Sequence, residues 1–325
     1  MSRSILLAAA AVFAIGACSR PSEQAATTPA APAMVKAHPL PAAIAYPEGI
    51  AFDEAAGVFY TAGATDGAVV KVDLASGAST PIAAAGVLTP AGSDIFPAVL
   101  GMKLDENKRL WLAGGRTGKL HVLDTTSGKV VKTLDTPGSG GLINDVTLTA
   151  DAAYFSDSFR PVVWKVGRAG GQVGAAEAWL DIGKAVAYGE GANINGLVST
   201  PDGKTLLLVQ MNKGLLFKVD IASKAVTPVN LNGQTLQGAD GLVLDGQRLY
   251  AVLQPHATIV AVNLAPDMTS GVVAGRLKSD ALAWPATAFK TGDRLVVVNT
   301  QFNKREGDTA SKPFSVSEIP VSLIK

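Results

Sequence analysis

The chain carries Glu48-Gly-Ile-Ala-Phe-Asp53, a short turn and Val58-Phe-Tyr-Thr61, a pair of strand-like runs that recurs five more times. The first residues of the six copies are Glu48, Leu100, Asn144, Asn195, Asp240 and Ala286. Successive copies start 52, 44, 51, 45 and 46 residues apart. A period of about 40–50 residues with several short strands in each copy is typical of propeller blades.

Each copy has room for four strands. A third run follows the pair and ends in a turn, as in Val69-Val-Lys-Val-Asp-Leu74, and a fourth run such as Val130-Val-Lys-Thr-Leu134 completes the unit. A sandwich would not keep this period through six copies, and a solenoid would leave an exposed edge at each end. The sequence therefore predicts an all-β, six-bladed β-propeller over residues 42–325.

Composition agrees with a strand-rich globular protein and excludes several function classes. The chain has 325 residues, 48% of them apolar and 17% charged, with 34 Gly and 18 Pro. A formal charge of +1 is too small for a general nucleic-acid binder. The single cysteine, Cys18, excludes an intramolecular disulfide and a cysteine-based metal site.

Residues 1–17 have the pattern of a bacterial export signal. Arg3 is followed by eleven apolar residues from Ile5 to Ile15, too few to cross a bilayer, which needs about 20. Ile15-Gly-Ala-Cys18 resembles a lipobox, in which the cysteine is lipidated; an ordinary signal peptide is the alternative. With Ser19 after Cys18, the resemblance implies an outer-membrane lipoprotein whose propeller faces the periplasm.

Residues 18–41 are rich in Ala, Pro and Thr, and their prolines argue against a helix or a central strand. We expect a tether here, with His38 in solvent.

The first residue of each copy deserves chemical scrutiny because inner strands of a propeller begin at the mouth of the central channel. Four of the six carry side-chain oxygens, and none is a thiol or an imidazole; the four are Glu48, Asn144, Asn195 and Asp240. Two carboxylates and two amides form a hard oxygen site, which suits Ca²⁺. Alternatively, each side chain caps its own strand, or the ion only holds the blades together.

Several stretches resemble the senescence marker protein-30/gluconolactonase family over about residues 45–320. They are Tyr46-Pro-Glu-Gly-Ile-Ala-Phe-Asp53, Ile194-Asn-Gly-Leu-Val198 and Gly238-Ala-Asp-Gly-Leu-Val243. The Glu, Asn, Asn, Asp set also resembles the catalytic calcium quartet of the related paraoxonases and diisopropylfluorophosphatase. The resemblance implies a Ca²⁺-dependent hydrolase of lactones, esters or organophosphates.

Asp240 is our first choice for the attack step, as base or nucleophile, with Asp145, Asp157 and His256 as rivals. His121 lies within a third strand and is expected to be structural. No arginine for sugar-lactone recognition stands out, and the chain has no Gly-x-Ser-x-Gly motif.

Three functions compete at this point. They are a calcium-dependent lactonase or esterase, a non-catalytic periplasmic propeller with a structural Ca²⁺ that binds a ligand or partner, and a metal-free enzyme of the strictosidine synthase type. Closed propellers leave few strand edges, so we expect a monomer that meets the membrane only through its lipid anchor.

Overall fold

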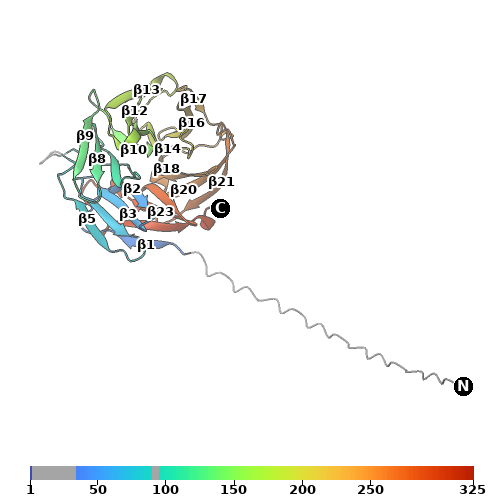
Figure 1. The fold of residues 1–325 in the computed structure, drawn as a ribbon, viewed down its shortest axis with the longest axis horizontal. Helices are drawn as coiled ribbons and strands as arrows, with labels where there is room; N and C mark the ends of the chain where they lie inside the picture. Colours follow the sequence, from blue (N-terminus) through green and yellow to red (C-terminus); the bar gives the residue numbers. More distant parts are fainter. Residues whose placement is uncertain (2–33, 90–94) are drawn as a thin grey trace. The chain divides into compact units, whose positions relative to one another are not determined.

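Six four-stranded antiparallel sheets are arranged around a central axis in the computed structural model, which describes Met1 and residues 34–89 and 95–325 (Figure 1). The predicted six-bladed β-propeller is confirmed. Five sheets are built from four consecutive strands, and the sixth combines strands from the two ends of the body, in the order β1-β24-β23-β22.

Equivalent strands occupy equivalent places in the six sheets. The inner strands are β2 (Pro47–Asp53), β6 (Met102–Leu104), β10 (Ile143–Leu148), β14 (Ile194–Ser199), β18 (Ala239–Asp245) and β22 (Pro285–Thr291). The second strands are β3 (Val58–Gly63), β7 (Arg109–Ala113), β11 (Ala152–Asp157), β15 (Thr205–Gln210), β19 (Arg248–Leu253) and β23 (Arg294–Asn299). The third strands are β4 (Val69–Asp73), β8 (Lys119–Asp124), β12 (Val162–Gly167), β16 (Leu215–Asp220), β20 (Thr258–Leu264) and β24 (Ser315–Pro320).

The outer strands are β5 (Ser79–Ala83), β9 (Val130–Asp135), β13 (Ala176–Asp181), β17 (Val226–Pro228), β21 (Gly271–Lys278) and β1 (Lys36–Pro39). Short 3-10 turns interrupt the connections; they are η1 (Ala169–Gly171), η2 (Ile182–Lys184), η3 (Gln254–His256), η4 (Phe302–Lys304) and η5 (Val321–Leu323). No helix within the described residues is long and apolar enough to cross a membrane.

The same local chemistry makes the turn after the third strand in several blades. Asp73 Oδ1 accepts hydrogen bonds from the Ser76 amide at 2.7 Å and from the Ser76 hydroxyl at 2.6 Å. The pair Asp124 and Ser127 repeats this arrangement in the second blade. An aspartate that bonds the backbone three residues on favours a tight turn over continued extension, and the third strands β4, β8 and β16 end at such an aspartate.

Neighbouring blades share their cores. One buried cluster joins Phe59 and Val70 of the first blade to Val296 and Val316 of the sixth, and Trp111 of the second blade packs in a cluster with Phe155 of the third. Full burial of each such large side chain stabilises the fold by about 1.5–3 kcal/mol. The blades are therefore held side by side around the axis by apolar packing.

The propeller begins at strand β1, from Lys36, and not at residue 42 as we expected. Residues 36–39 pair with β24, with Lys36 opposite Glu318 and His38 opposite Val316. A proline cannot sit in a central strand, but Pro39 ends an outer strand that pairs on one side only, where a missing amide donor costs no ladder bond. His38 is not in open solvent, because its Nε2 lies 2.9 Å from Glu318 Oε2.

Candidate metal centre

Each candidate ligand lies in a β-bulge at the start of an inner strand. The pairing register shifts between Pro47 and Ile50, and the same shift recurs in the inner strands of blades three to six. A bulge leaves its residues unpaired and redirects their side chains. The bulged residues include Glu48, Asn144, Asn195 and Asp240.

Glycines next to these residues let the inner strands approach one another closely. A Cβ at Gly196 would collide with the backbone carbonyl of Asp240 in the next blade, and a Cβ at Gly241 would collide with Thr287. The bulges and the glycines together place the ligand residues of adjacent blades around one point on the axis.

One cavity of about 200 Å³ collects the four side chains. Glu48, Asn144, Asn195 and Asp240 all line it, and each is only 3–5% exposed. Leu100, the equivalent residue of the second blade, also lines it. The structure therefore brings together the four oxygen-bearing residues that the repeat pattern singles out.

Neighbouring side chains fix the orientation of three of the four. Asn144 Nδ2 donates to Ser158 Oγ at 2.9 Å, which leaves Asn144 Oδ1 for a ligand. Asn195 Nδ2 donates to Met211 Sδ at 3.2 Å. Gln254 Nε2 donates to Asp240 Oδ2 at 2.6 Å and itself lines the cavity.

Two of the four side chains keep a buried oxygen without a hydrogen-bond partner. These atoms are Glu48 Oε2 and Asn195 Oδ1. A buried acceptor without a partner carries a desolvation cost that a bound cation would remove. The donor set, all oxygen and with two carboxylates, fits Ca²⁺. No cluster of three or more His, Cys, Asp or Glu side chains arranged for a metal occurs in the described residues, so the fit depends on the two amides.

The carboxylates destabilise one another's charge in the protein alone. Burial raises the pKa of Glu48 well above its usual value, and the negative charges of Asp240 and Asp145 add to the rise while Lys103 opposes it. Burial also raises the pKa of Asp240 to about 8, helped by Asp145 and opposed by the amides of Asn195 and Gln254. A divalent cation would favour the ionised forms of both ligands.

No protein-family model matches the sequence, and no curated protein matches it either. Solved structures share the fold. The calcium-binding protein regucalcin from Agrobacterium tumefaciens is 18% identical and superposes with a TM-score of 0.60, covering 85% of this chain and 90% of its own. The allergen Mala s 1 of Malassezia sympodialis is 13% identical, with a TM-score of 0.63 and coverage of 86% and 94%. A chain of the nidogen/laminin complex is 14% identical, with a TM-score of 0.58 and coverage of 81% and 89%.

Asp157 is not placed to act as a base. It is fully buried, its Oδ1 accepts from the backbone amides of Leu142, Phe159 and Arg160, and its Oδ2 pairs with Arg160 Nε at 2.6 Å. Both oxygens are bonded to the chain itself, to the loop after β11, to Leu142 and to Trp164 of β12, and Asp157 does not line the carboxylate cavity. The structure therefore gives Asp157 a structural role in place of the catalytic one that we expected.

His256 does not reach the carboxylate cavity either. It is exposed on η3 and lines an adjoining cavity of about 420 Å³ together with Met211 and Pro255. The 3-10 turn after β19 places His256 at the rim, outside the carboxylate cavity, and not in the catalytic position that we expected for it. Asp145 does not line the carboxylate cavity either; it is buried on β10 and accepts from the amide of Val146 at 2.8 Å. The predicted lipidation site, Cys18, lies outside the described residues.

Sequence reasoning missed three apolar residues of the cavity wall. Pro97, Leu142 and Ala192 line the cavity from the connections that enter the second, third and fourth inner strands. Each stands two or three residues before the start of its copy. The repeat period could therefore have located them.

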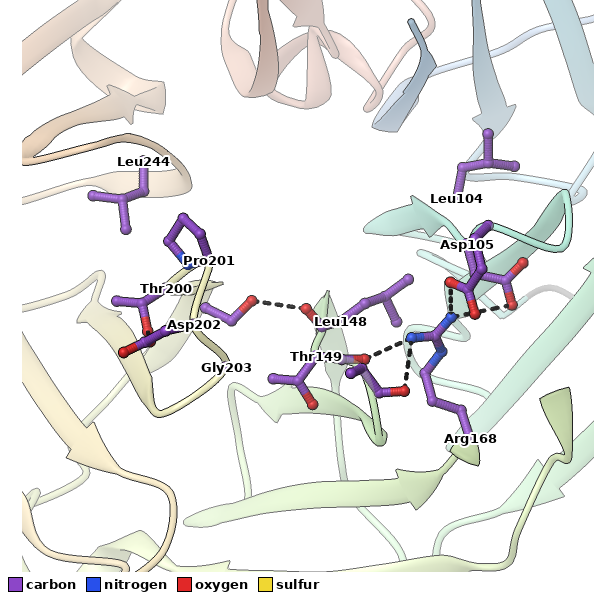
Figure 2. Close-up of a pocket in the computed structure, with 13 residues that line it drawn as sticks. Leu104, Asp105, Leu148, Thr149, Arg168, Thr200, Pro201, Asp202, Gly203 and Leu244 are labelled. Carbon is purple, nitrogen blue, oxygen red and sulfur yellow. Dashed lines mark hydrogen bonds and ion pairs between the residues drawn. The ribbon is translucent and has the colours of Figure 1, made fainter. Parts of the chain in front are cut away.

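A third cavity, of about 400 Å³, lies at the other end of the inner strands, where Leu104, Leu148 and Leu244 contribute to its wall. Figure 2 shows the Arg168 guanidinium at its side, directed at Asp105 and at Thr149. Arg168 pairs with Asp105 and Glu106 and donates to the Thr149 carbonyl. Two carboxylates neutralise this cation, so the pocket offers no net charge from Arg168 to a ligand.

Proposed function

We propose that this chain is a calcium-dependent hydrolase of lactones or esters. The observation that carries the proposal is the pair of unpartnered buried oxygens, Glu48 Oε2 and Asn195 Oδ1, in a cavity lined by four oxygen-bearing side chains. Family-like motifs in the sequence and the fold shared with regucalcin, described as a calcium-binding protein, support it.

Glu48, Asn144, Asn195 and Asp240 would hold the ion. Bound there, Ca²⁺ would polarise the carbonyl of the substrate as a Lewis acid. Ser158 and Met211 keep the two amides turned so that their oxygens remain free for the ion. The four side chains are 3–5% exposed, and this burial strengthens each electrostatic interaction among them.

Asp240 is the residue we propose for the attack step. Its carboxylate, which accepts a hydrogen bond from Gln254 at Oδ2, would take up a proton as water adds to the carbonyl carbon. When the carbon–oxygen bond breaks, that proton passes to the departing alkoxide. The products are a carboxylic acid and an alcohol, joined in one molecule when the substrate is a lactone.

Proton release from a panel of aldonolactones, alkyl lactones, aryl esters and phosphotriesters tests the proposal. We expect the full-length chain to hydrolyse at least one class with calcium, to stop with chelator and to recover when calcium is restored. Asp240→Asn should lower kcat by about 100-fold or more. Asp245→Asn, an exposed carboxylate at the other end of the same strand, should match wild type.

Two results would contradict the proposal at different points. If no class is hydrolysed while calorimetry shows bound calcium, the chain is a binding propeller with a structural ion. If Asp240→Asn binds calcium and keeps full activity, the attack step belongs to another group, with Asp145 next in line.

We further propose that the protein is an outer-membrane lipoprotein acting in the periplasm, on the strength of Ile15-Gly-Ala-Cys18 and Ser19 in the sequence. Metabolic labelling with a palmitate analogue in a bacterial host should label the wild type and not Cys18→Ser. Equal labelling of the two would contradict this proposal.

A further inference from the structure

Lys103 lies in the central channel. It is the middle residue of the inner strand β6 and lines a cavity of about 340 Å³, which we call the lower cavity. The rest of that wall comes from the inner strands of the first, fourth, fifth and sixth blades, which contribute Phe52, Val198, Leu242 and Phe289 among others. A cavity bounded by the inner strands of five blades lies on the propeller axis.

The lower cavity follows the carboxylate cavity along the same strands. On β2, Glu48 lines the carboxylate cavity and Ile50 the lower one, and on β18 Asp240 and Leu242 are divided in the same way. Lys103 therefore lies beneath the candidate metal ligands.

The close approach of β6 to the third blade points in the same direction. A Cβ at Gly101, which precedes β6, would collide with Asp145. Alternate residues of a strand face the same side, so Lys103 faces the blade that carries Asp145.

Three buried carboxylates surround this part of the axis, and each is only 3–4% exposed; they are Glu48, Asp145 and Asp240. Burial raises the pKa of Glu48 and of Asp145, and Lys103 is the cation that opposes both rises. Lys103 is partly buried, and its ammonium has no hydrogen bond or ion pair with any side chain that the structure describes. Its charge is therefore not neutralised by a contact partner and acts on the carboxylates across the channel.

We propose that Lys103 is a fixed positive charge that matches the axial site to a divalent cation. This inference rests on the calcium centre of the proposed function. The three ionised carboxylates carry three negative charges, of which Lys103 balances one and a divalent ion balances two. A trivalent ion would leave one buried positive charge without compensation, which is costly in a site of low dielectric.

Lys290 offers a matched control because it lines the same lower cavity. Its Nζ lies 3.1 Å from Asp245 Oδ2, so a carboxylate already balances its charge. The remaining charged residue on that wall, Glu54, is exposed to solvent. Lys103 is thus the charge on the wall that acts on the metal site without a counter-charge of its own.

The test compares calcium with terbium(III), which is close to calcium in size and also prefers oxygen ligands but carries one more charge. Calorimetric titration of the full-length protein with each ion at one mildly acidic pH gives the ratio of the two affinities. Both ions displace the same protons from the carboxylates, so the contribution of these protons cancels in the ratio. In Lys103→Met both ions should bind more tightly, and the terbium-to-calcium affinity ratio should rise by about 10-fold or more, because the trivalent ion is relieved of more repulsion.

Three further variants separate charge from shape. Lys103→Arg keeps the charge and should keep the wild-type ratio, and Lys290→Met should also keep it. Lys103→Gln is neutral but polar and should raise the ratio as Lys103→Met does, so the comparison does not depend on one variant that might fold poorly.

An unchanged ratio in both neutral variants, with calcium bound by the wild type, would overturn this inference and leave the calcium centre standing. An equal rise in Lys103→Arg or in Lys290→Met would also overturn it, because the effect would then not come from the charge of Lys103. A wild type that binds neither ion would overturn the metal centre itself and with it the proposed function.

Discussion

Ser158 shows how one buried hydroxyl can control a candidate metal ligand. Its Oγ accepts from Asn144 Nδ2 at 2.9 Å and donates to the Ile194 carbonyl at 2.8 Å, so it fixes the Asn144 amide from outside the cavity. We expect Ser158→Ala to weaken calcium affinity by about 10-fold or more, because residues that orient metal ligands usually contribute 10–100-fold. Calorimetric titration with calcium measures this change.

Ser317 provides a matched control in the sixth blade. Its Oγ accepts from Asn299 Nδ2 at 2.9 Å and donates to the Ala281 carbonyl at 2.6 Å, which is the same arrangement around an asparagine that does not line the cavity. Ser317→Ala should lower the free energy of unfolding by a similar amount and leave calcium affinity unchanged. If the two variants lose calcium affinity equally, the effect of Ser158 is general destabilisation.

Acidification should destabilise the fold through His121. Burial lowers its pKa from 6.5 to about 4, and its Nε2 has no partner while Nδ1 lies 3.1 Å from Thr133 Oγ1. Between these two pKa values the unfolded chain binds a proton that the folded protein does not. Stability is therefore full above about pH 6.5 and is lost as the pH falls towards 4, by about 3 kcal/mol from this group.

Chemical denaturation of the wild type and His121→Gln between pH 4.5 and 7.5 measures the effect. The glutamine can still bond Thr133 but does not titrate, so the difference between the two proteins isolates the histidine. We expect the wild type to lose more stability on acidification. If the stabilities of the two proteins fall in parallel with pH, His121 is protonated at the same pKa in the folded and the unfolded state, and the prediction is wrong.

Single residues also mark the limit of what the sequence could predict about the site. Glu48 and Asn195 were recognisable because a repeat gives every copy an equivalent residue. The role of Asp157 was not recognisable, because it depends on Arg160 and on three backbone amides, one of them from Leu142 in another connection, that only the folded chain brings to it. The sequence pattern of a carboxylate near a channel mouth is the same whether its side chain faces a substrate or hydrogen-bonds its own loop.

At the scale of the element, β1 is the piece that sequence patterns hid. Four residues at the end of a proline-rich stretch carry little strand signal by themselves, and their partner, β24, lies about 280 residues further on. Pairing with a preformed edge supplies what local propensity lacks. The inner strands were predictable because each carries its own apolar pattern within one repeat.

Removing β1 should open the sixth blade. A chain that starts at Pro41 loses the ladder with β24 and the contact of His38 with Glu318, which also pairs with Arg294. We expect it to be less stable than a chain that starts at Met34 by about 3 kcal/mol, from several backbone hydrogen bonds of about 1 kcal/mol each. Thermal unfolding of the two chains decides this, and equal Tm values would show that β24 closes the propeller without β1.

For the whole molecule, calcium and protons compete at the axis where all six blades meet. Since the pKa of Asp240 is raised to about 8 and that of Glu48 is also raised, the folded calcium-free protein holds protons that the unfolded chain releases. Its stability is therefore greatest at low pH within this window and falls as the pH rises towards 8, by about 1–2 kcal/mol between pH 6.5 and 8. His121 is neutral in the folded protein over that range, and its opposing contribution amounts to about 0.4 kcal/mol, confined to the lower end near pH 6.5.

Calcium should reverse this trend, because it binds the ionised carboxylates that destabilise the protein alone. We expect its stabilisation of the fold to grow from pH 6.5 to pH 8, and its binding to release protons, seen as a buffer-dependent enthalpy in calorimetry. Thermal unfolding in chelator and in calcium across this range measures the first effect, with Asp240→Asn as the variant that loses most of the slope. A chelated protein whose stability is flat from pH 6.5 to 8 would mean that the carboxylates are already neutralised by groups of the chain, and the axis would then have no need of a cation.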